Sequence, residues 1–262
     1  MRQSLGAVVL LLLAGCGAGG TSGGSSGGAS GGGDRTLDVL AASSLAESFQ
    51  TLADTFEKSH PGVHVRLVLE SSATLATQVT QGAPADVLAT ADEETMQGVV
   101  DAGSASDPKL FATNQLVLIT PADNPAGIQS LADLDNSDVS YVACVETAPC
   151  GSLAHDLLAR NHISTEPRSL EVDVKSVLAK VTADEADAGL VYATDAQAAG
   201  DSVQSFPVPG AEQERNPYEI AVVDQSDDSG LAGEWVDLVT STAGQKVLAD
   251  AGFGPPQADG TP

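Results

Sequence analysis

The chain has 262 residues, which is long enough to bury one large hydrophobic core or two smaller ones. Its 36 acidic and 11 basic residues give a net charge of -25, which disfavours binding to nucleic acid or to an anionic membrane surface. Aromatic residues make up only 3% of the chain, and its small and aliphatic residues suit packed α/β layers better than a disordered protein.

The N-terminus indicates export. Met1-Arg2 precedes an apolar run over residues 5–14, which is too short for a permanent membrane-spanning helix. The small residues before Cys16 resemble the end of a bacterial lipoprotein signal, so residues 1–15 are predicted to be a signal peptide and Cys16 to carry the lipid. Residues 16–35 would then be the lipidated cysteine and a flexible Gly/Ser-rich tether. An ordinary signal peptide with an incidental cysteine is the alternative.

Two junctions near the start of the chain run from a strand through serine into a helix. A buried strand over residues 37–42 precedes an amphipathic helix, and the spacing of Ser44 and Glu47 is that of a capping box, which predicts a helix that begins at Ser44. A strand over residues 63–69 is followed in the same way by a helix at Ser72. Each junction offers a hydroxyl, free N–H groups and the positive end of a helix dipole, which together suit an anion. Taken singly, each serine is equally well explained as a helix cap.

The rest of the chain continues to alternate short apolar strands with amphipathic helices. Strands are predicted over residues 85–90, 115–120, 140–144, 170–174, 189–192, 203–207 and 218–223, and helices from residue 92, over 151–162 and 175–184, from 193, and over 231–240 and 245–251. This alternation predicts an α/β fold with mainly parallel, doubly wound sheets. Ser44 and Ser72 should then lie at one sheet edge, because neighbouring parallel strands end there and open α/β sheets bind ligands there.

Three further positions could supply donors to the same edge. Cys144 and Cys150 lie close together in an exported protein, which predicts a disulfide, and the bond would hold the Cys150 amide rigidly at the start of a helix. Val174 begins another helix, for which Asp173 is a plain N-cap. Tyr192 ends an apolar strand and can either present its hydroxyl to a cleft or fill the core.

Enzyme signatures are absent from the sequence. We find no G-x-S-x-G, P-loop, H-E-x-x-H or G-x-G-x-x-G after a strand. His60 and His64 flank a Pro-Gly turn, and His155 and His162 lie seven residues apart on one predicted helix, so neither pair forms a metal or catalytic constellation. We therefore expect no enzymatic activity, no catalytic residue, no cofactor and no bound metal cation.

Five separated motifs, all in order, resemble those of the molybdate-binding proteins of bacterial ABC importers. They are residues 39–45 (VLAASSL), 70–75 (ESSATL), 82–87 (GAPADV), Asp173-Val174 and residues 189–195 (GLVYATD). The resemblance spans residues 37–253. It implies a periplasmic-binding-protein-like fold of type II, with two α/β lobes joined by two crossing strands and the ligand in the cleft between them. Lobe I would comprise residues 36–114 plus 218–254 and lobe II residues 115–217, with a disordered tail at 255–262.

The resemblance also implies a ligand and the residues that hold it. In that family, molybdate or tungstate is bound by hydrogen bonds alone, without a counter-charge. The matching positions are Ser44 and Ser72 through hydroxyl and amide, Cys150 and Val174 through the backbone amide, and Tyr192 through its hydroxyl. Two positions depart from the family pattern, because Cys150 stands where a small residue is common and Ala73 where some members carry a third serine.

The sequence therefore predicts a monomeric lipoprotein, lipid-anchored on the outer face of the cytoplasmic membrane, that captures molybdate or tungstate and delivers it to an ABC permease. A receptor for sulfate, phosphate or ferric iron is the first alternative. Iron would require clustered tyrosines and carboxylates, and the chain has only Tyr141, Tyr192 and Tyr218. An exported hydrolase with Ser44 as nucleophile is the second alternative, and it would need a base beside that serine.

Overall fold

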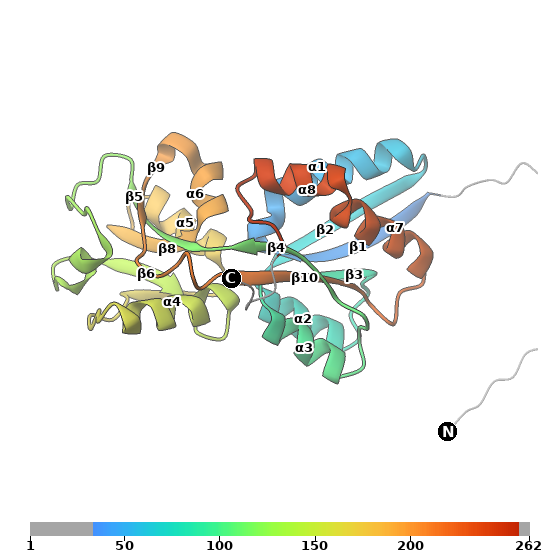
Figure 1. Ribbon diagram of the computed structural model, residues 1–262, viewed down its shortest axis with the longest axis horizontal. Helices are drawn as coiled ribbons and strands as arrows, with labels where there is room; N and C mark the ends of the chain where they lie inside the picture. The colour runs from blue at the N-terminus through green and yellow to red at the C-terminus, as the bar shows by residue number, and fades with distance from the viewer. Residues whose placement is uncertain (1–33, 257–262) are drawn as a thin grey trace, which may run out of the picture. The chain divides into compact units, whose positions relative to one another are not determined.

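The computed structural model describes residues 34–256, which form two five-stranded sheets flanked by helices (Figure 1). The strand order is β2-β1-β3-β10-β4 in the first sheet and β7-β6-β8-β5-β9 in the second. We call each sheet with its helices a lobe, lobe I and lobe II in chain order. The predicted α/β class with two sheets is confirmed. The predictions for the signal peptide (1–15), for Cys16, for residues 17–33 of the tether and for residues 257–262 of the predicted 255–262 tail lie outside the described residues.

Lobe I is built from the first part of the chain and the return segment. Its strands are β1 (Arg35–Ala42), β2 (Val63–Glu70), β3 (Val87–Thr90), β4 (Lys109–Asn114) and β10 (Asn216–Val222). Its helices are α1 (Ala46–Ser59), α2 (Ser72–Thr80), α3 (Glu93–Asp101), α7 (Ser229–Thr240) and α8 (Thr242–Asp250), and a 3-10 turn, η1 (Ser43–Leu45), precedes α1.

Lobe II contains the residues between the two crossings. Its strands are β5 (Leu116–Pro121), β6 (Tyr141–Cys144), β7 (Ser169–Glu171), β8 (Ala188–Tyr192) and β9 (Val203–Pro207). Its helices are α4 (Pro149–Arg160), α5 (Val174–Thr182) and α6 (Ala193–Ala199), with 3-10 turns η2 (Leu131–Asp135) and η3 (Gly200–Ser202).

In each sheet one strand runs against the other four. It is β10 in lobe I, antiparallel to β3 and β4, and β5 in lobe II, antiparallel to β8 and β9. These are the two strands by which the chain enters each lobe from the other, from β4 into β5 and from β9 into β10. The prediction of mainly parallel sheets is therefore confirmed, and both exceptions are crossing strands.

Aromatic packing holds α1 and α7 on the sheet of lobe I. The Trp235 ring makes edge-to-face contacts with Phe49 and Phe56 at centroid distances of 5.6 and 5.5 Å, and all three side chains are fully buried. Burying an apolar side chain of this size contributes about 1.5–3 kcal/mol. The start of α1, which directly follows the turn η1 that contains Ser44, is thereby fixed relative to the ends of the strands.

The structure corrects three local predictions. The helix does not begin at Ser44 with a capping box, because residues 43–45 form the turn η1 and no side chain caps η1 or α1. Strand β4 was not predicted; its KLFATN sequence is short, and antiparallel pairing with β10 buries only its second half. The predicted strand over 170–174 ends at Glu171, because Asp173 accepts the Ser176 N–H and starts α5.

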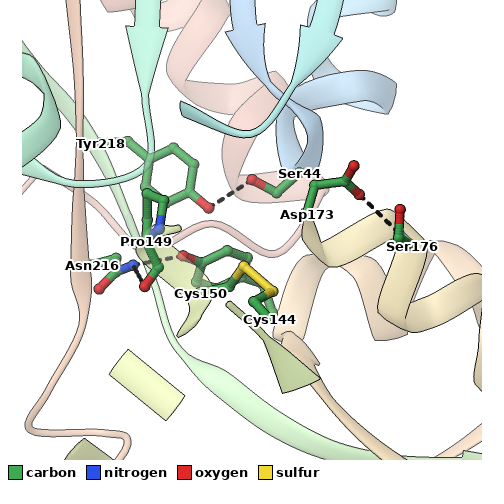
Figure 2. The surroundings of a disulfide bond; sticks show 9 residues. Ser44, Cys144, Pro149, Cys150, Asp173, Ser176, Asn216 and Tyr218 are labelled. Atoms are coloured by element: carbon green, nitrogen blue, oxygen red, sulfur yellow. Dashed lines mark hydrogen bonds between the residues drawn. A yellow bond between two sulfur atoms is a disulfide. The ribbon is translucent and has the colours of Figure 1, made fainter. Parts of the chain in front are cut away.

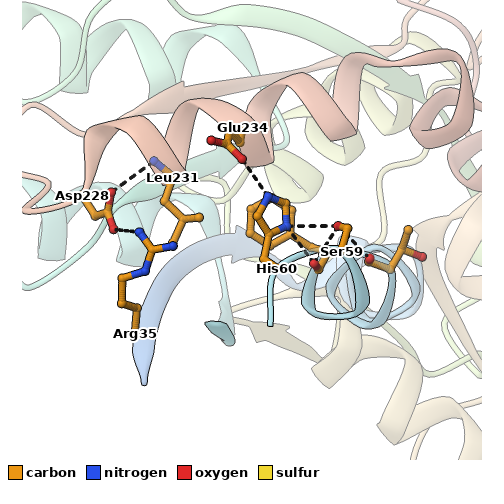
Figure 3. Close-up of polar contacts among 8 residues, drawn as sticks. Arg35, Ser59, His60, Asp228, Leu231 and Glu234 are labelled. Carbon is orange, nitrogen blue, oxygen red and sulfur yellow. Dashed lines mark hydrogen bonds and ion pairs between the residues drawn. The ribbon is translucent and has the colours of Figure 1, made fainter. Parts of the chain in front are cut away.

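Polar contacts on the surface of lobe I tie α7 to its neighbours (Figure 3). The Arg35 guanidinium lies 3.0 Å from the Asp228 carboxylate, and Nε2 of His60 lies 2.7 Å from Oε2 of Glu234. Such exposed pairs contribute typically under about 1 kcal/mol each. Within residues 34–256, no helix combines the length and apolar character needed to cross a membrane.

Candidate functional site

The structure brings all five predicted ligand-contacting residues to one small pocket where the two lobes meet. Ser44 and Ser72 come from lobe I, and Cys150, Val174 and Tyr192 from lobe II. The pocket leaves about 10 Å³ for the centre of a water-sized molecule, which is less than a four-oxygen anion needs. Figure 2 shows the disulfide and the hydrogen-bonded residues around it, with Ser44 from lobe I and Cys150 and Asp173 from lobe II.

Ser44 and Ser72 reach the same edge because β1 and β2 pair in parallel and end together. Ala42 pairs with Glu70 in the last register position, and each serine follows two residues later. Ser44 is 3% and Ser72 1% exposed. Neither hydroxyl caps its own helix, since Oγ of Ser44 lies 2.8 Å from Oη of Tyr218, and Oγ of Ser72 accepts the Ala91 N–H at 3.0 Å. The interpretation of the serines as plain helix caps is therefore wrong.

Two helix N-termini of lobe II point backbone amides at the pocket. The first N–H groups of a helix have no partner within it, and the helix dipole adds positive potential there. Cys150 is the second residue of α4, which has no side-chain cap, and Val174 is the first residue of α5. Asp173 accepts the Ser176 N–H at 2.8 Å rather than the Val174 N–H, and Val174 lines the pocket.

The disulfide between Cys144 and Cys150, predicted from the sequence, is present and ties the end of β6 to the start of α4. The backbone there is very closely packed. A Cβ atom on Gly151 would lie 1.8 Å from the Val145 carbonyl oxygen, so only glycine fits after Cys150. The bond and the close contact together fix the position of the Cys150 amide.

Tyr192 ends β8 and is 2% exposed. Its hydroxyl oxygen accepts a hydrogen bond from Nδ2 of Asn216 at 2.6 Å (Figure 2). Burial raises the pKa of Tyr192 well above its usual value, so the phenol stays protonated and keeps a hydrogen to donate. The alternative role as a pure core residue does not account for its place in the pocket lining.

The charges around the pocket exclude a cation as the main partner of an anion. No lysine, arginine or histidine is among the described residues that line it. Lys175, beside Val174, directs Nζ to Oε1 of Glu47 at 2.8 Å and to Oδ1 of Asp195 at 3.1 Å, so two carboxylates neutralise it. The donors in the pocket are therefore neutral hydroxyl and amide groups in a buried environment, where hydrogen bonds to a charged group are strongest, and the Glu70 and Asp173 carboxylates line the pocket beside them.

Three buried side chains behind the pocket were not predicted. Tyr218 holds the Ser44 hydroxyl, Asn216 holds Tyr192, and Nδ2 of Asn114 donates to Oγ1 of Thr194 at 2.9 Å and to Oη of Tyr218 at 3.5 Å. Their position in the sequence could have pointed to them, because the resemblance places the two lobe crossings near Asn114 and at residues 216–218. Polar residues at the ends of two crossing strands have few reasons to be buried other than a site.

The alternative chemistries find little support in the described part of the chain. No group of three or more His, Cys, Asp or Glu residues there could hold a metal ion. Ser44 has a tyrosine rather than a histidine as its partner, so it lacks the base that a nucleophile needs. A larger cavity of about 230 Å³ lies within lobe II, lined by α4 and β6, and contains none of the five predicted ligand-contacting residues.

Comparison with known proteins places this geometry in context. Residues 37–254 match the family described as bacterial extracellular solute-binding protein. The molybdate-binding protein ModA of Mycobacterium tuberculosis is 40% identical over 255 residues, which cover 97% of this chain and 98% of that protein.

Two solved structures share the fold at 20% sequence identity. The periplasmic molybdate-binding protein of Azotobacter vinelandii matches with a TM-score of 0.76 over 84% of this chain and 100% of that one. The sulfate-binding protein SubI of Mycobacterium tuberculosis matches with a TM-score of 0.73 over 84% of this chain and 87% of that one. The fold alone therefore does not distinguish a molybdate receptor from a sulfate receptor.

Proposed function

Because the chain belongs to the bacterial extracellular solute-binding proteins, and within them to the molybdate-binding proteins, we propose that it captures molybdate, and tungstate with it, outside the cytoplasm. It then presents the anion to the permease of an ABC importer. We propose further that it acts without a cofactor or a metal cation, as a monomer, and catalyses no reaction.

One observation carries this proposal. Hydroxyl and amide donors from both lobes converge on one pocket, and no basic side chain is among the described residues that line it. Ser44 and Ser72 each offer a hydroxyl and an amide, Tyr192 a hydroxyl, and Cys150 and Val174 an amide. A tetrahedral dianion has enough lone pairs to accept from all of them. With a net charge of -25, the protein must rely on such short-range donors rather than on its overall field.

The same donors explain how oxyanions could be distinguished. Hydrogen phosphate carries a proton, which needs an acceptor, and the five proposed contact residues all donate, so none of them pairs with that proton. Sulfate has no proton and can be rejected only by size, since its bonds to oxygen are shorter than those of molybdate. Rejection by size requires the two lobes to close to a fixed separation. The Cys144–Cys150 disulfide and the Lys175–Glu47 ion pair between α5 and α1 help to set that separation.

Titration calorimetry with molybdate, tungstate, sulfate and phosphate tests the proposal. We expect molybdate and tungstate to bind tightly and the other two ions at least about a hundredfold more weakly, since an ill-fitting anion loses several hydrogen bonds at once. Sulfate binding as tight as that of molybdate would make the protein a sulfate receptor. Turnover of an ester substrate that Ser44→Ala abolishes would make it a hydrolase.

The membrane anchor and the permease form a separate part of the proposal. We propose that Cys16 is lipidated after cleavage behind residue 15, which would keep the receptor at the outer face of the membrane. Mass spectrometry of the full-length protein from its membrane fraction should show a diacylglyceryl-modified Cys16, and Cys16→Ser should release the protein into the soluble fraction. An unmodified cysteine in the membrane-extracted protein would refute lipid anchoring but leave molybdate binding untouched.

A further inference from the structure

Behind the pocket, the hydroxyl oxygens of Ser44, Ser72 and Tyr192 each make a hydrogen bond to another group of the protein. Oγ of Ser72 accepts from the Ala91 N–H, and Oη of Tyr192 accepts from Asn216. Oγ of Ser44 lies against Oη of Tyr218 at 2.8 Å, a contact in which either oxygen could donate. The direction of that third bond decides whether Ser44 can donate to a ligand.

Two asparagines at the lobe crossings, Asn114 and Asn216, fix the direction. We call them the hinge asparagines, because each ends or begins a crossing strand and the two are paired in register between β4 and β10. Oδ1 of Asn114 accepts the Gln115 N–H at 3.0 Å, so its nitrogen must face Thr194 and Tyr218. Nδ2 of Asn216 donates to the Pro149 carbonyl at 3.1 Å, which a nitrogen can do and an oxygen cannot. Both amides therefore face the tyrosines as donors.

The two asparagine donors determine where the hydroxyl hydrogens of the network point. Tyr218 receives the amide hydrogen of Asn114, and among its described partners only Ser44 is left to accept its own hydroxyl hydrogen. The hydrogen of Ser44 finds no acceptor among its described partners and is left for the pocket.

We propose that the hinge asparagines are positioning residues that determine which oxyanions the site accepts. They supply hydrogens to the acceptor side of the network and so turn the hydroxyl hydrogens of Ser44 and Tyr192 toward the ligand. The hydroxyls of Ser44 and Tyr192 then act as donors toward the ligand, which disfavours an oxyanion that brings its own proton. This inference rests on the proposed function and deepens it, because it assigns the discrimination to side chains that do not touch the anion.

The burial of the network makes this control effective. Tyr218 is 0% exposed, Asn114 3% and Asn216 8%, so water cannot readily replace a missing partner. The two acidic side chains that line the pocket each accept one hydrogen bond from the protein, Glu70 from Nε2 of Gln78 and Asp173 from the Ser176 N–H. The network itself sets the direction of the Ser44 and Tyr192 hydroxyls.

The test compares sulfate with hydrogen phosphate, which have the same charge and similar size under mildly alkaline conditions and differ by one proton. Each is used to displace bound molybdate, and the ratio of the two inhibition constants is measured. In Tyr218→Phe, Ser44 loses the hydrogen it received and can accept from the ligand. We expect molybdate and sulfate to bind roughly three- to tenfold more weakly, and the preference for sulfate over hydrogen phosphate to narrow by a similar factor.

Asn114→Asp provides a second measurement. The new carboxylate can still accept the Gln115 N–H, but it offers Tyr218 an acceptor instead of a donor, so the tyrosine hydrogen turns away from Ser44. The preference for sulfate over hydrogen phosphate should become smaller, as in Tyr218→Phe. Thermal unfolding establishes that each variant is folded, and Tyr218→Phe decides the matter if the buried carboxylate prevents folding.

Tyr141→Phe is the matched control. Tyr141 is also a buried tyrosine, but its hydroxyl donates to the Thr165 carbonyl within lobe II, away from the pocket. The Tyr141→Phe variant should be less stable than wild type and should keep the wild-type ratio of the sulfate and hydrogen phosphate inhibition constants. If Tyr218→Phe binds every anion more weakly by one common factor, the role is structural and the inference is overturned. A wild-type protein that fails to bind molybdate would instead overturn the proposed function itself.

Discussion

Two groups of polar contacts in lobe I have similar lengths and very different surroundings. The bond between Ser44 and Tyr218 is 2.8 Å long and lies between side chains that are 3% and 0% exposed. The contact of Arg35 with Asp228 is 3.0 Å long, and these side chains are 55% and 36% exposed (Figures 2 and 3). Water competes for the second contact and is excluded from the first.

The comparison shows that burial, rather than distance, decides what a polar contact does in this protein. Around the pocket, each group keeps the partner that the fold gives it, so donors stay donors when a ligand arrives. On the outer face of α7, a lost partner is replaced by water at little cost. Four substitutions can break or sharpen this contrast.

The largest effect is expected at Asp195, a buried carboxylate in the first turn of α6. It is 0% exposed, and burial raises its pKa to about 6 although Lys175 lies 3.1 Å away and opposes the shift. A carboxyl whose pKa is raised by folding binds its proton longer in the folded state than in the unfolded one. The folded state therefore loses stability as pH rises from about 4 to about 6, and the loss persists above that range.

Asp195→Asn removes this dependence. A shift from 3.8 to about 6 corresponds to about 3 kcal/mol, so the unfolding free energy of the variant relative to wild type should increase by up to about 3 kcal/mol between pH 4 and pH 7.5. Denaturant unfolding of both proteins across this range measures it. Asp228→Asn, at an exposed carboxylate, is the control. A difference between Asp195→Asn and wild type that does not change with pH would contradict the prediction.

Ser44→Ala should weaken molybdate binding by roughly ten- to a hundredfold. It removes one charge-assisted hydrogen bond, worth about 1.5–3 kcal/mol, and leaves the Tyr218 hydroxyl unpaired. Calorimetry gives the affinity. Ser48→Ala is a matched control, because Ser48 is a buried serine of the same helix whose hydroxyl donates to the Leu45 carbonyl. Equal losses in the two variants would show that Ser44 does not contact the anion.

Replacing both Cys144 and Cys150 by serine should lower the unfolding free energy by about 2 kcal/mol, as expected for a cross-link that closes so short a loop. Molybdate affinity should fall less than in Ser44→Ala, because the backbone N–H at position 150 remains. Denaturation with and without a reductant checks the first statement, since wild type in reductant should match the double variant. A reductant that also destabilises the double variant would show that the effect does not come from this bond.

The smallest effect is expected on the outer face. Arg35→Ala should change the unfolding free energy by less than about 0.5 kcal/mol and leave molybdate affinity unchanged, because the Arg35–Asp228 pair is exposed to solvent. Urea unfolding at two salt concentrations measures it. A loss of unfolding free energy as large as that of a buried contact would show that solvent exposure does not predict the contribution of this ion pair.

Much of the fold could be read from local pattern. The apolar runs over 37–42 and 189–192 predicted strands, and the junction at Ser72 predicted a helix, all of which the structure contains. Pattern failed where pairing decided the outcome, as in β4, whose burial depends on β10 from a distant part of the chain. The local pattern also gave a wrong prediction at Ser44, because the same local sequence fits a capping box and a serine whose hydroxyl bonds to Tyr218 instead.

The sequence by itself determined the α/β class, the strand-to-serine junctions, the disulfide and, through family resemblance, five positions that could face a ligand. Their roles in binding remain predictions, although the fold brings all five to one pocket. Only the tertiary structure showed which groups stand behind them. Tyr218 and the hinge asparagines are separated by up to 174 residues from the hydroxyls they orient, and no local pattern records a hydrogen bond over such a distance. Its direction depends on what is buried beside it, which becomes defined only when β4 and β10 pair.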